Sequence, residues 1–236
     1  MNIAIILAGG SGTRMGNMNE PKQFAEVFGK PIIVHTLEKF DLHPEIDQII
    51  IGCKEDYIDD VKIMVRKYSL DKVKKIVSAG GTRQETVFKC LTALKEAVEN
   101  DDIVIIHDSV RPLISTRIIS DNISAAKEHQ AVDTVIPASD TIVRSTDSIH
   151  IEEIPKRAEF YQGQTPQSFQ YKLIVDAHSY CLENHIKNAT DDCQLVMKYG
   201  QKVALVIGDQ FNFKITNQDD LVLLKALIKL GSLERL

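Results

Sequence analysis

The sequence predicts an α/β fold with a doubly wound, mostly parallel β-sheet, and three observations support this prediction. Short β-branched apolar runs recur along the 236 residues, as expected of strands that are buried on both faces. Longer amphipathic segments separate these runs, which is typical of helices that connect parallel strands. The chain is 44% hydrophobic and 26% charged, so it has enough apolar side chains for one large core.

The predicted strands are nearly continuous apolar runs rather than alternating ones. Five of them lie at residues 3–7, 49–51, 103–106, 132–136 and 203–207, and a further strand is predicted at 75–77. A strand with apolar residues at successive positions needs cover on both faces, because its side chains point alternately to either side. The fold class is therefore predicted to be Rossmann-like.

Residues that favour helix starts precede several amphipathic segments. Pro31 opens one of them, because its fixed backbone angle suits the first turn of a helix. Thr82, with Glu85 three residues later, forms a capping box before another. Three further helices have Ser115, Thr190 and Asn217 as their predicted N-caps.

Residues 139–170 interrupt the alternation of strands and helices. No helix is predicted there, and the β-prone pieces 141–143 and 149–151 alternate with Ser, Asp and Pro. A segment of this length without a helix, inside a compact domain, is usually functional. We therefore predict a single domain over residues 1–236, with a projecting β-hairpin arm at about 139–170.

Charge and cysteine usage exclude several classes of protein. The net charge of −5 gives no basic surplus for nucleic acid or an anionic membrane, so phosphate binding would need a local concentration of Lys and Arg. The four cysteines form no CxxC pair, which argues against a zinc or redox motif. No signal peptide or spanning segment is evident, and a cytoplasmic protein with reduced thiols is predicted.

The first chemical motif is the glycine-rich run at residues 7–16, directly after the first predicted strand. Its glycines let the backbone approach a phosphate closely, and Arg14 and Lys22 add cations nearby. The run matches neither GxGxxG nor a P-loop. A tight turn with solvated charges is the alternative. The glycines and the two cations together favour a triphosphate site at the carboxyl end of the strand.

The glycine run and the Pro-Lys-Gln-Phe sequence at 21–24 resemble the nucleotide-binding signature of sugar- and polyol-phosphate nucleotidyltransferases. Further motifs follow in order at 107–112, 161–169, 190–192 and 212–216. Together they are similar to the cytidylyltransferase family that contains 2-C-methyl-D-erythritol 4-phosphate and D-ribitol 5-phosphate cytidylyltransferases. The Ser109-Val110 pair and the Gln162–Gln164 run resemble the ribitol-phosphate branch more closely.

The resemblance assigns roles to individual residues. Arg14, Lys22 and Lys214 are implied to be catalytic. The implied nucleotide-binding residues are Leu7, Ala8, Gly9, Gly10, Gly12, Thr13, Gly80, Gly81, Arg83 and Thr86. The implied substrate-binding residues are Asp108, Arg111, Thr141, Arg157, Thr165 and Thr190. Asp108 is also the implied ligand of Mg²⁺.

Each assignment has a structural alternative. Asp108 ends a buried strand, where its carboxylate can bind a hard cation or merely cap the next turn. Lys214 stands between two apolar residues and could be a solvated lysine. Gln162 and Gln164 offer amide groups to a hydroxylated acceptor, or they only stabilise the arm. In relatives the arm, which would carry Arg157 and Thr165, reaches the partner's site, so a homodimer is expected.

The predicted reaction joins CTP and a polyol phosphate, preferably D-ribitol 5-phosphate, and gives a CDP-polyol and pyrophosphate. The attacking phosphate is already anionic at neutral pH, so positioning and charge neutralisation suffice without a general base. The alternatives are methylerythritol phosphate as the acceptor, a nicotinamide dehydrogenase and a catalytically inactive nucleotide-binding regulator. A dehydrogenase would need an intact GxGxxG, which the chain lacks.

Overall fold

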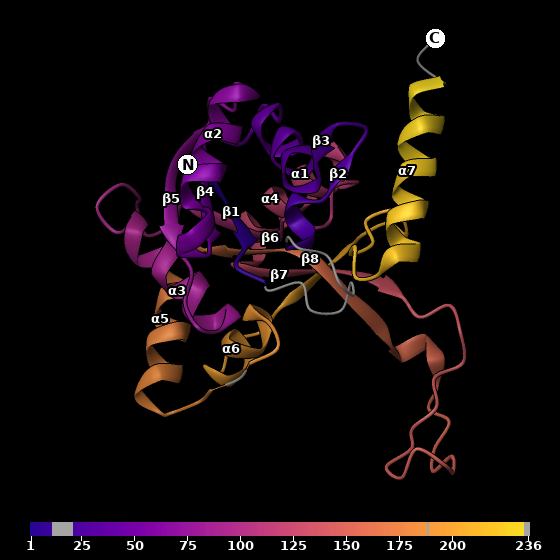
Figure 1. Cartoon of the computed structure of the whole chain (residues 1–236). Helices are drawn as coiled ribbons and strands as arrows, with labels where there is room; N and C mark the ends of the chain where they lie inside the picture. The colour runs from indigo at the N-terminus through magenta and orange to yellow at the C-terminus, as the bar shows by residue number, and fades with distance from the viewer. Residues whose placement is uncertain (11–20, 188, 234–236) are drawn as a thin grey trace.

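The structure is a computed structural model that describes residues 1–10, 21–187 and 189–233. Figure 1 shows a central sheet between two layers of helices, with one segment that extends away from this body. No helix in the described ranges is long and apolar enough to cross a membrane. All four cysteines are buried and free.

The central sheet has seven strands in the order β5-β4-β1-β6-β8-β7-β9. The strands are β1 (Asn2–Ala8), β4 (Gln48–Cys53), β5 (Val73–Ser78), β6 (Ile103–Asp108), β7 (Ala131–Pro137), β8 (Tyr161–Gln170) and β9 (Ala204–Ile207). Among these described strands, only β8 is antiparallel to its neighbours, β6 and β7. The predicted doubly wound, mostly parallel fold is therefore confirmed.

Two apolar cores lie on opposite faces of the sheet, as the continuous apolar runs predict. In β1, Ala4 and Ile6 face one core, whereas Ile3 and Ile5 face the other. The first core is covered by α1 (Ile32–Asp41), α2 (Ile58–Lys67) and α4 (Thr116–His129). The second is covered by α3 (Arg83–Leu94), α5 (Tyr171–Glu183) and α6 (Asp192–Lys198). Both layers are visible in Figure 1.

A third, smaller core lies at one end of the sheet, where α7 (Gln218–Leu233) packs. There Leu221 and Leu224 cluster with Val110 and Ile215. The same cluster includes Val27 of the short hairpin formed by β2 (Glu26–Val27) and β3 (Lys30–Pro31), and Ala25 and Ile32, which flank this hairpin. The chain segments on either side of the site described below are thereby tied to one another.

Three of the four predicted caps are present. Thr82, Ser115 and Asn217 accept hydrogen bonds from the amides of Glu85, Ile118 and Asp220. Glu85 accepts from Gly81 N at 2.8 Å rather than from its N-cap residue. Thr190 is the wrong cap: Asp191 accepts from Gln194 N at 2.8 Å and begins α6. A carboxylate one position nearer the helix takes this role.

The predicted arm needs a correction at both of its strands. Neither 141–143 nor 149–151 forms a strand, and the structure has only a single bridge between Arg144 and Glu153 there. Residues 161–170 belong to β8 of the main sheet. We therefore restrict the name "arm" to residues 138–160, which leave the sheet after β7 and return into β8 (Figure 1).

The polar sequence of β8 explains why it was predicted as part of the arm. Four consecutive residues, 164–167, are polar or proline, yet all four are buried. Gln164 donates to Asp209 O at 2.8 Å, and Gln167 donates to Asp133 Oδ1 at 3.0 Å. Because buried amides with partners carry little penalty, a polar strand can lie inside the sheet.

Candidate active site

A cavity of about 380 Å³ lies at the carboxyl ends of the parallel strands, where ligands of α/β sheets bind. It brings together ten of the predicted site residues. These are Leu7, Gly9, Gly10, Lys22, Gly80, Gly81, Arg83, Thr86, Asp108 and Lys214. Gln23, Thr82, Ser109 and Val110 also line it. The predicted residues Gly12, Thr13 and Arg14 lie outside the described residues.

The backbone after β1 is held by a side chain that the sequence analysis did not assign. Gln23 is almost fully buried, and its Nε2 donates to Ala8 O at 2.8 Å and to Gly10 O at 3.1 Å. These bonds fix the start of the glycine run against the short 3₁₀ turn Lys22–Phe24. One signal in the sequence could have identified Gln23. It stands between the cation Lys22 and the apolar Phe24, which is buried, in the Pro-Lys-Gln-Phe motif.

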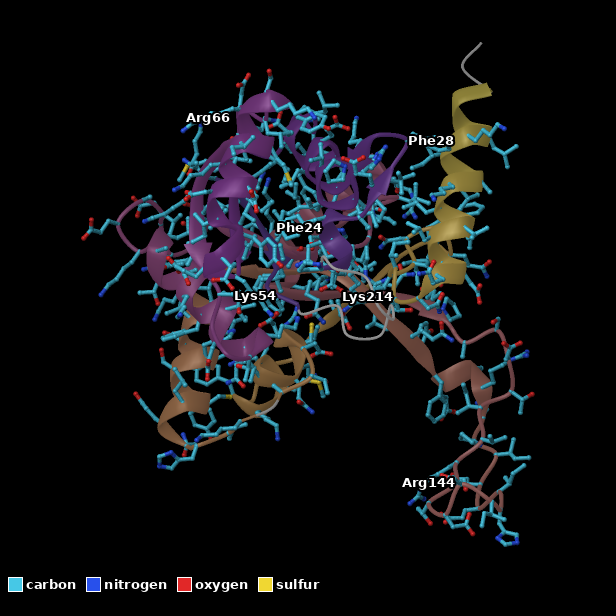
Figure 2. The ribbon with its side chains drawn as sticks, viewed as in Figure 1. Phe24, Phe28, Lys54, Arg66, Arg144 and Lys214 are labelled. Atoms are coloured by element: carbon cyan, nitrogen blue, oxygen red, sulfur yellow. The ribbon has the colours of Figure 1, made fainter. Side chains whose placement is uncertain are left out.

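Two lysines reach the cavity from opposite ends of the sequence. Lys22 Nζ donates to Ile215 O at 2.9 Å, which ties the 3₁₀ turn to the segment before α7. Lys214 Nζ lies 3.0 Å from Asp108 Oδ2. Figure 2 shows Lys214 between the sheet and the base of α7. Lys214 is therefore a paired residue of the site rather than a solvated lysine.

Asp108 ends β6 and is the negative centre of the cavity. Its Oδ2 faces Lys214 Nζ at 3.0 Å and Arg111 Nε at 3.4 Å. Burial raises the pKa of this carboxyl, but the charges of Lys214, Arg111 and Arg83 outweigh burial and hold the pKa well below its usual range. Asp108 is therefore ionised, and its side chain forms ion pairs rather than a turn cap.

Behind Asp108, a buried hydrogen-bond chain fixes the end of β6. Asp108 N donates to Thr165 Oγ1 at 3.1 Å, and the same oxygen lies 3.0 Å from His107 Nδ1. His107 Nε2 faces Arg111 O at 3.2 Å. Burial lowers the pKa of His107 to about 4, so the ring is neutral. Nε2 then carries the hydrogen, and the Thr165 hydroxyl donates to Nδ1.

Thr165 and Arg111 support the cavity without lining it. The sequence predicts Thr165 on the arm, and this prediction is wrong. Thr165 lies in β8 of the same chain. Arg111 Nη1 donates to Asn212 O at 2.8 Å, which links the end of β6 to the segment that carries Lys214. Both residues thereby position Asp108 and Lys214 relative to each other.

The opposite wall of the cavity is the glycine turn before α3. Thr86 Oγ1 accepts from Gly80 N at 3.0 Å and donates to Thr82 O at 2.9 Å. A Cβ on Gly80 would lie 2.3 Å from the Glu85 Cβ, so only glycine fits at this position. The Thr86 hydroxyl thus holds the turn itself, and the close approach of the turn to α3 makes this wall stiff.

Three predicted substrate-binding residues lie away from the cavity. Thr141 and Arg157 are exposed on the arm, where Arg157 Nη1 donates to Ser139 O at 2.9 Å. Thr190 lines a different hollow, together with Asp133 and Asp191. Figure 2 shows Arg144 at the far end of the arm, well away from Lys214. A single chain does not bring these three residues to the cavity.

These features define a class of protein before any comparison is made. Glycine turns, two lysines and one ionised carboxylate surround a cavity at the carboxyl end of a parallel sheet. This arrangement suits a phosphate-rich nucleotide whose charge must be neutralised, as in the nucleotidyltransferases.

Comparisons with known proteins specify the family. The family model for 2-C-methyl-D-erythritol 4-phosphate cytidylyltransferase matches residues 2–230. A ribitol-5-phosphate cytidylyltransferase of Lactiplantibacillus plantarum is 43% identical over 231 residues, which cover 97% of this chain and 99% of that protein. The chain therefore belongs to the 2-C-methyl-D-erythritol 4-phosphate cytidylyltransferase family.

Solved structures agree with this assignment. The 4-diphosphocytidyl-2C-methyl-D-erythritol synthase of Anaerococcus prevotii has a TM-score of 0.81 and 32% identity, covering 97% of this chain and 96% of that chain. The 2-C-methyl-D-erythritol 4-phosphate cytidylyltransferase of Francisella tularensis has a TM-score of 0.78 and 28% identity, covering 94% and 96%. The resemblance predicted from the motifs is confirmed, and the chain is an enzyme, a nucleotidyltransferase. The dehydrogenase alternative is excluded.

Proposed function

We propose that this enzyme transfers CMP from CTP to D-ribitol 5-phosphate and releases pyrophosphate. The observation that carries the choice of acceptor is the 43% identity, over nearly the whole length of both chains, to a ribitol-5-phosphate cytidylyltransferase. The Ser109-Val110 pair beside Asp108 is consistent with this choice, and Ser109 lines the cavity. The alternative acceptor is 2-C-methyl-D-erythritol 4-phosphate.

In the proposed reaction, a phosphate oxygen of the acceptor attacks the α-phosphorus of CTP in line. A new phosphorus–oxygen bond forms, and the bond to the β-phosphate oxygen breaks, so pyrophosphate leaves with the electron pair. Lys22 and Lys214 stabilise the negative charge that develops, and the backbone amides after β1 bind the triphosphate. Arg14 is proposed to assist them. The stiff glycine turn before α3 would recognise cytosine through its backbone groups.

Mg²⁺ is the proposed cofactor, and the chemistry of the cavity fits it. Among the described residues, no three His, Cys, Asp or Glu side chains gather into a metal site. Mg²⁺, however, is commonly bound by one carboxylate with phosphate oxygens and waters. Both ion pairs of Asp108 use Oδ2, which leaves Oδ1 for a metal ion. The ion would neutralise charge on the triphosphate.

A homodimer is the proposed assembly, with Arg157 and Thr141 of one arm completing the partner's site. Apolar side chains on the arm support this proposal: Ile149 is 80% exposed, and Ile151 and Ile154 are each 61% exposed. A nearly strandless segment with exposed apolar residues needs a surface to pack on. Thr165, which is already bonded to Asp108 within its own chain, has no part in this trans contact.

The two glutamines that were considered for acceptor recognition differ in what they can do. Gln164 Oε1 accepts from Asn212 Nδ2 at 3.1 Å, and its Nε2 donates to Asp209 O at 2.8 Å. Its amide therefore stabilises the end of the sheet. Gln162 is exposed and remains the candidate for contact with a hydroxylated acceptor.

The acceptor is tested by measuring kcat/KM side by side with the two polyol phosphates at saturating CTP, using pyrophosphate release. We expect ribitol 5-phosphate to be preferred, because a site built to bind a hydroxyl strongly rejects an analogue that lacks it. Preference for methylerythritol phosphate would overturn the acceptor only. Absence of pyrophosphate release from CTP with both acceptors, or release from another NTP instead of CTP, would overturn the cytidylyltransferase assignment.

A further inference from the structure

A buried polar cluster lies directly behind the nucleotide cavity and is not explained by the reaction. It links Arg83 of α3, His178 of α5 and Asp192 of α6, three helices that pack side by side on one face of the sheet (Figure 1). Arg83 lines the cavity, whereas His178 and Asp192 are fully buried. The cluster therefore connects the cavity wall to the interior of the helical layer.

Asp192 is the centre of the cluster and holds Arg83. Its Oδ2 lies 2.5 Å from Arg83 Nη1, and its Oδ1 lies 3.1 Å from His178 Nε2. A fully buried carboxylate is stable in its ionised form only when both oxygens have partners. Arg83 supplies one partner and His178 supplies the other. The orientation of the Arg83 guanidinium thus depends on a carboxylate that His178 helps to fix.

His178 contacts Asp192 through one ring nitrogen. An ionised carboxylate can only accept, so Nε2 carries a hydrogen and donates it in this contact. Phe88 stacks on the ring with 5.8 Å between centroids and an interplanar angle of 17°. Nδ1 is buried and has no hydrogen-bond partner among the described residues. A buried ring nitrogen without a partner is unfavourable, so packing alone would favour an apolar side chain at this position.

We infer that His178 is a positioning residue for nucleotide binding, which acts through Asp192 to orient Arg83 in the CTP cavity. The inference rests on the proposed cytidylyltransferase function. The Arg83 side chain lines the cavity and is 26% exposed, so it is open to a bound nucleotide on one side while Asp192 holds it on the other. Loss of the bond from His178 would leave one oxygen of a buried carboxylate unpaired and would let Asp192 and Arg83 shift together.

Two variants separate hydrogen bonding from packing. His178→Phe keeps an aromatic ring against Phe88 but cannot donate to Asp192. A cavity of about 320 Å³ beside His178 gives the slightly larger ring room. His178→Gln loses the ring but keeps a donor that can reach the carboxylate. The calorimetric Kd of CTP with Mg²⁺, without acceptor, is the main readout, together with the KM values of CTP and acceptor.

We expect His178→Phe to raise the Kd and the KM of CTP about 10-fold or more, whereas His178→Gln stays within about 3-fold of the wild type. The KM of the acceptor should not change in either. Phe88→Leu is the matched packing control and should leave CTP binding unchanged. If Phe is tolerated and Gln is not, or if both variants behave alike, the inference is overturned.

A double-mutant cycle tests whether His178 acts through Arg83. In an Arg83→Ala background, His178→Phe should cause no further loss of CTP affinity, because the residue that it orients is gone. Additive losses would overturn the inference. If His178→Phe alone lowers stability, the cycle still tests the inference, because all CTP affinities are measured on folded protein. Wild-type protein that binds no CTP would instead refute the proposed function.

Discussion

The nucleotide cavity and the arm are built in opposite ways. In the cavity, Asp108 is 8% exposed and its carboxylate faces two cations, and Gln23 is 2% exposed and holds two carbonyls. On the arm, Ile149 is 80% exposed, and Arg144 and Glu153 form a lone bridge. In the cavity the polar groups of Asp108 and Gln23 are paired within the chain, whereas the arm exposes apolar groups that the chain does not cover.

This difference suggests different roles for the cavity and the arm in binding the nucleotide and the acceptor. The fixed contacts of the cavity are those that a nucleotide needs, because a triphosphate must meet preorganised charges. We propose that the arm supplies residues for the acceptor, and a single chain does not bring them to the cavity. We therefore expect changes in the cavity to affect nucleotide chemistry within each chain, and changes in the arm to act between chains.

The largest effect is expected from Lys22→Ala. Removing one preorganised cation at the triphosphate should lower kcat by about 10²- to 10³-fold without unfolding the protein. Steady-state pyrophosphate release and a thermal melt check this. Lys39→Ala, which changes an exposed lysine of α1, is the control and should have wild-type kcat. Near-normal turnover of the Lys22 variant would remove this lysine from the mechanism.

Asp108→Asn should weaken the response to Mg²⁺. The amide keeps the shape of the carboxylate but loses the charge that a hard cation requires. We expect the Mg²⁺ concentration at half-maximal activity to rise by roughly 10- to 100-fold. Asp121→Asn, an exposed change on α4, serves as the comparison. An unchanged magnesium titration would refute Asp108 as the metal ligand.

Asp133→Asn should stabilise the folded body in a pH-dependent way. Burial raises the pKa of Asp133 to about 6, and the charge of Asp191 adds to this despite the hydrogen bond from Gln167. The folded state therefore binds the proton more tightly, and wild-type stability falls as the pH rises from about 4 to about 6.

The variant lacks this loss and should gain about 3 kcal/mol at pH 7. At pH 4, where the folded wild type is protonated and its unfolded state is only partly ionised, the gain should shrink to less than about 1 kcal/mol. Denaturant unfolding at the two pH values measures it. An equal gain at both would show that ionisation of Asp133 is not the cause.

Subunit mixing tests the arm directly. An Arg157→Ala protein and a Lys22→Ala protein, each impaired alone, should recover about one quarter of the wild-type activity after exchange, because half of the dimers are hybrids with one intact site. Mass spectrometry confirms the exchange. If hybrids form and activity stays absent, each site is completed within its own chain.

The smallest effect is expected from Ile149→Ala, on the free energy of unfolding of the monomer. At protein concentrations below dimer dissociation, the free energy of unfolding should change by less than about 0.5 kcal/mol, because the side chain has nothing to pack on. Ile106→Ala in β6, where the side chain is fully buried, should cost about 2–5 kcal/mol. Ile149→Ala should nevertheless raise the dissociation constant of the dimer in sedimentation experiments. No change in that constant would exclude Ile149 from the interface.

The cavity could be predicted from the sequence because its motifs follow parallel strands. The glycine run follows β1, Gly80 follows β5 and Asp108 ends β6, and the carboxyl ends of such strands meet at one edge. Lys214 was assigned through the resemblance, and the contact with Asp108 confirms its place in the cavity.

The supports behind the cavity could not be predicted, because their partners are remote in the sequence. Nothing in the sequence around His178 marks Asp192, fourteen positions later, as its partner. The polar β8 reads as a loop until its amides are seen to pair inside the sheet. A sequence pattern indicates which side chains favour water. It does not indicate which buried groups form the hydrogen bonds that water would otherwise form.

The place where the arm joins the sheet has a consequence for how such enzymes diverge. The arm starts and ends on neighbouring antiparallel strands, with Pro137 opposite Tyr161 and with Ala138 N bonded to Phe160 O at 3.0 Å. Its two ends are thus already held together, and the entropy of closing a loop rises only slowly with its length. Insertions, deletions and grafts are tolerated at such a junction. The arm can therefore change in length and sequence, with whatever it binds, without disturbing the strands that form the cavity.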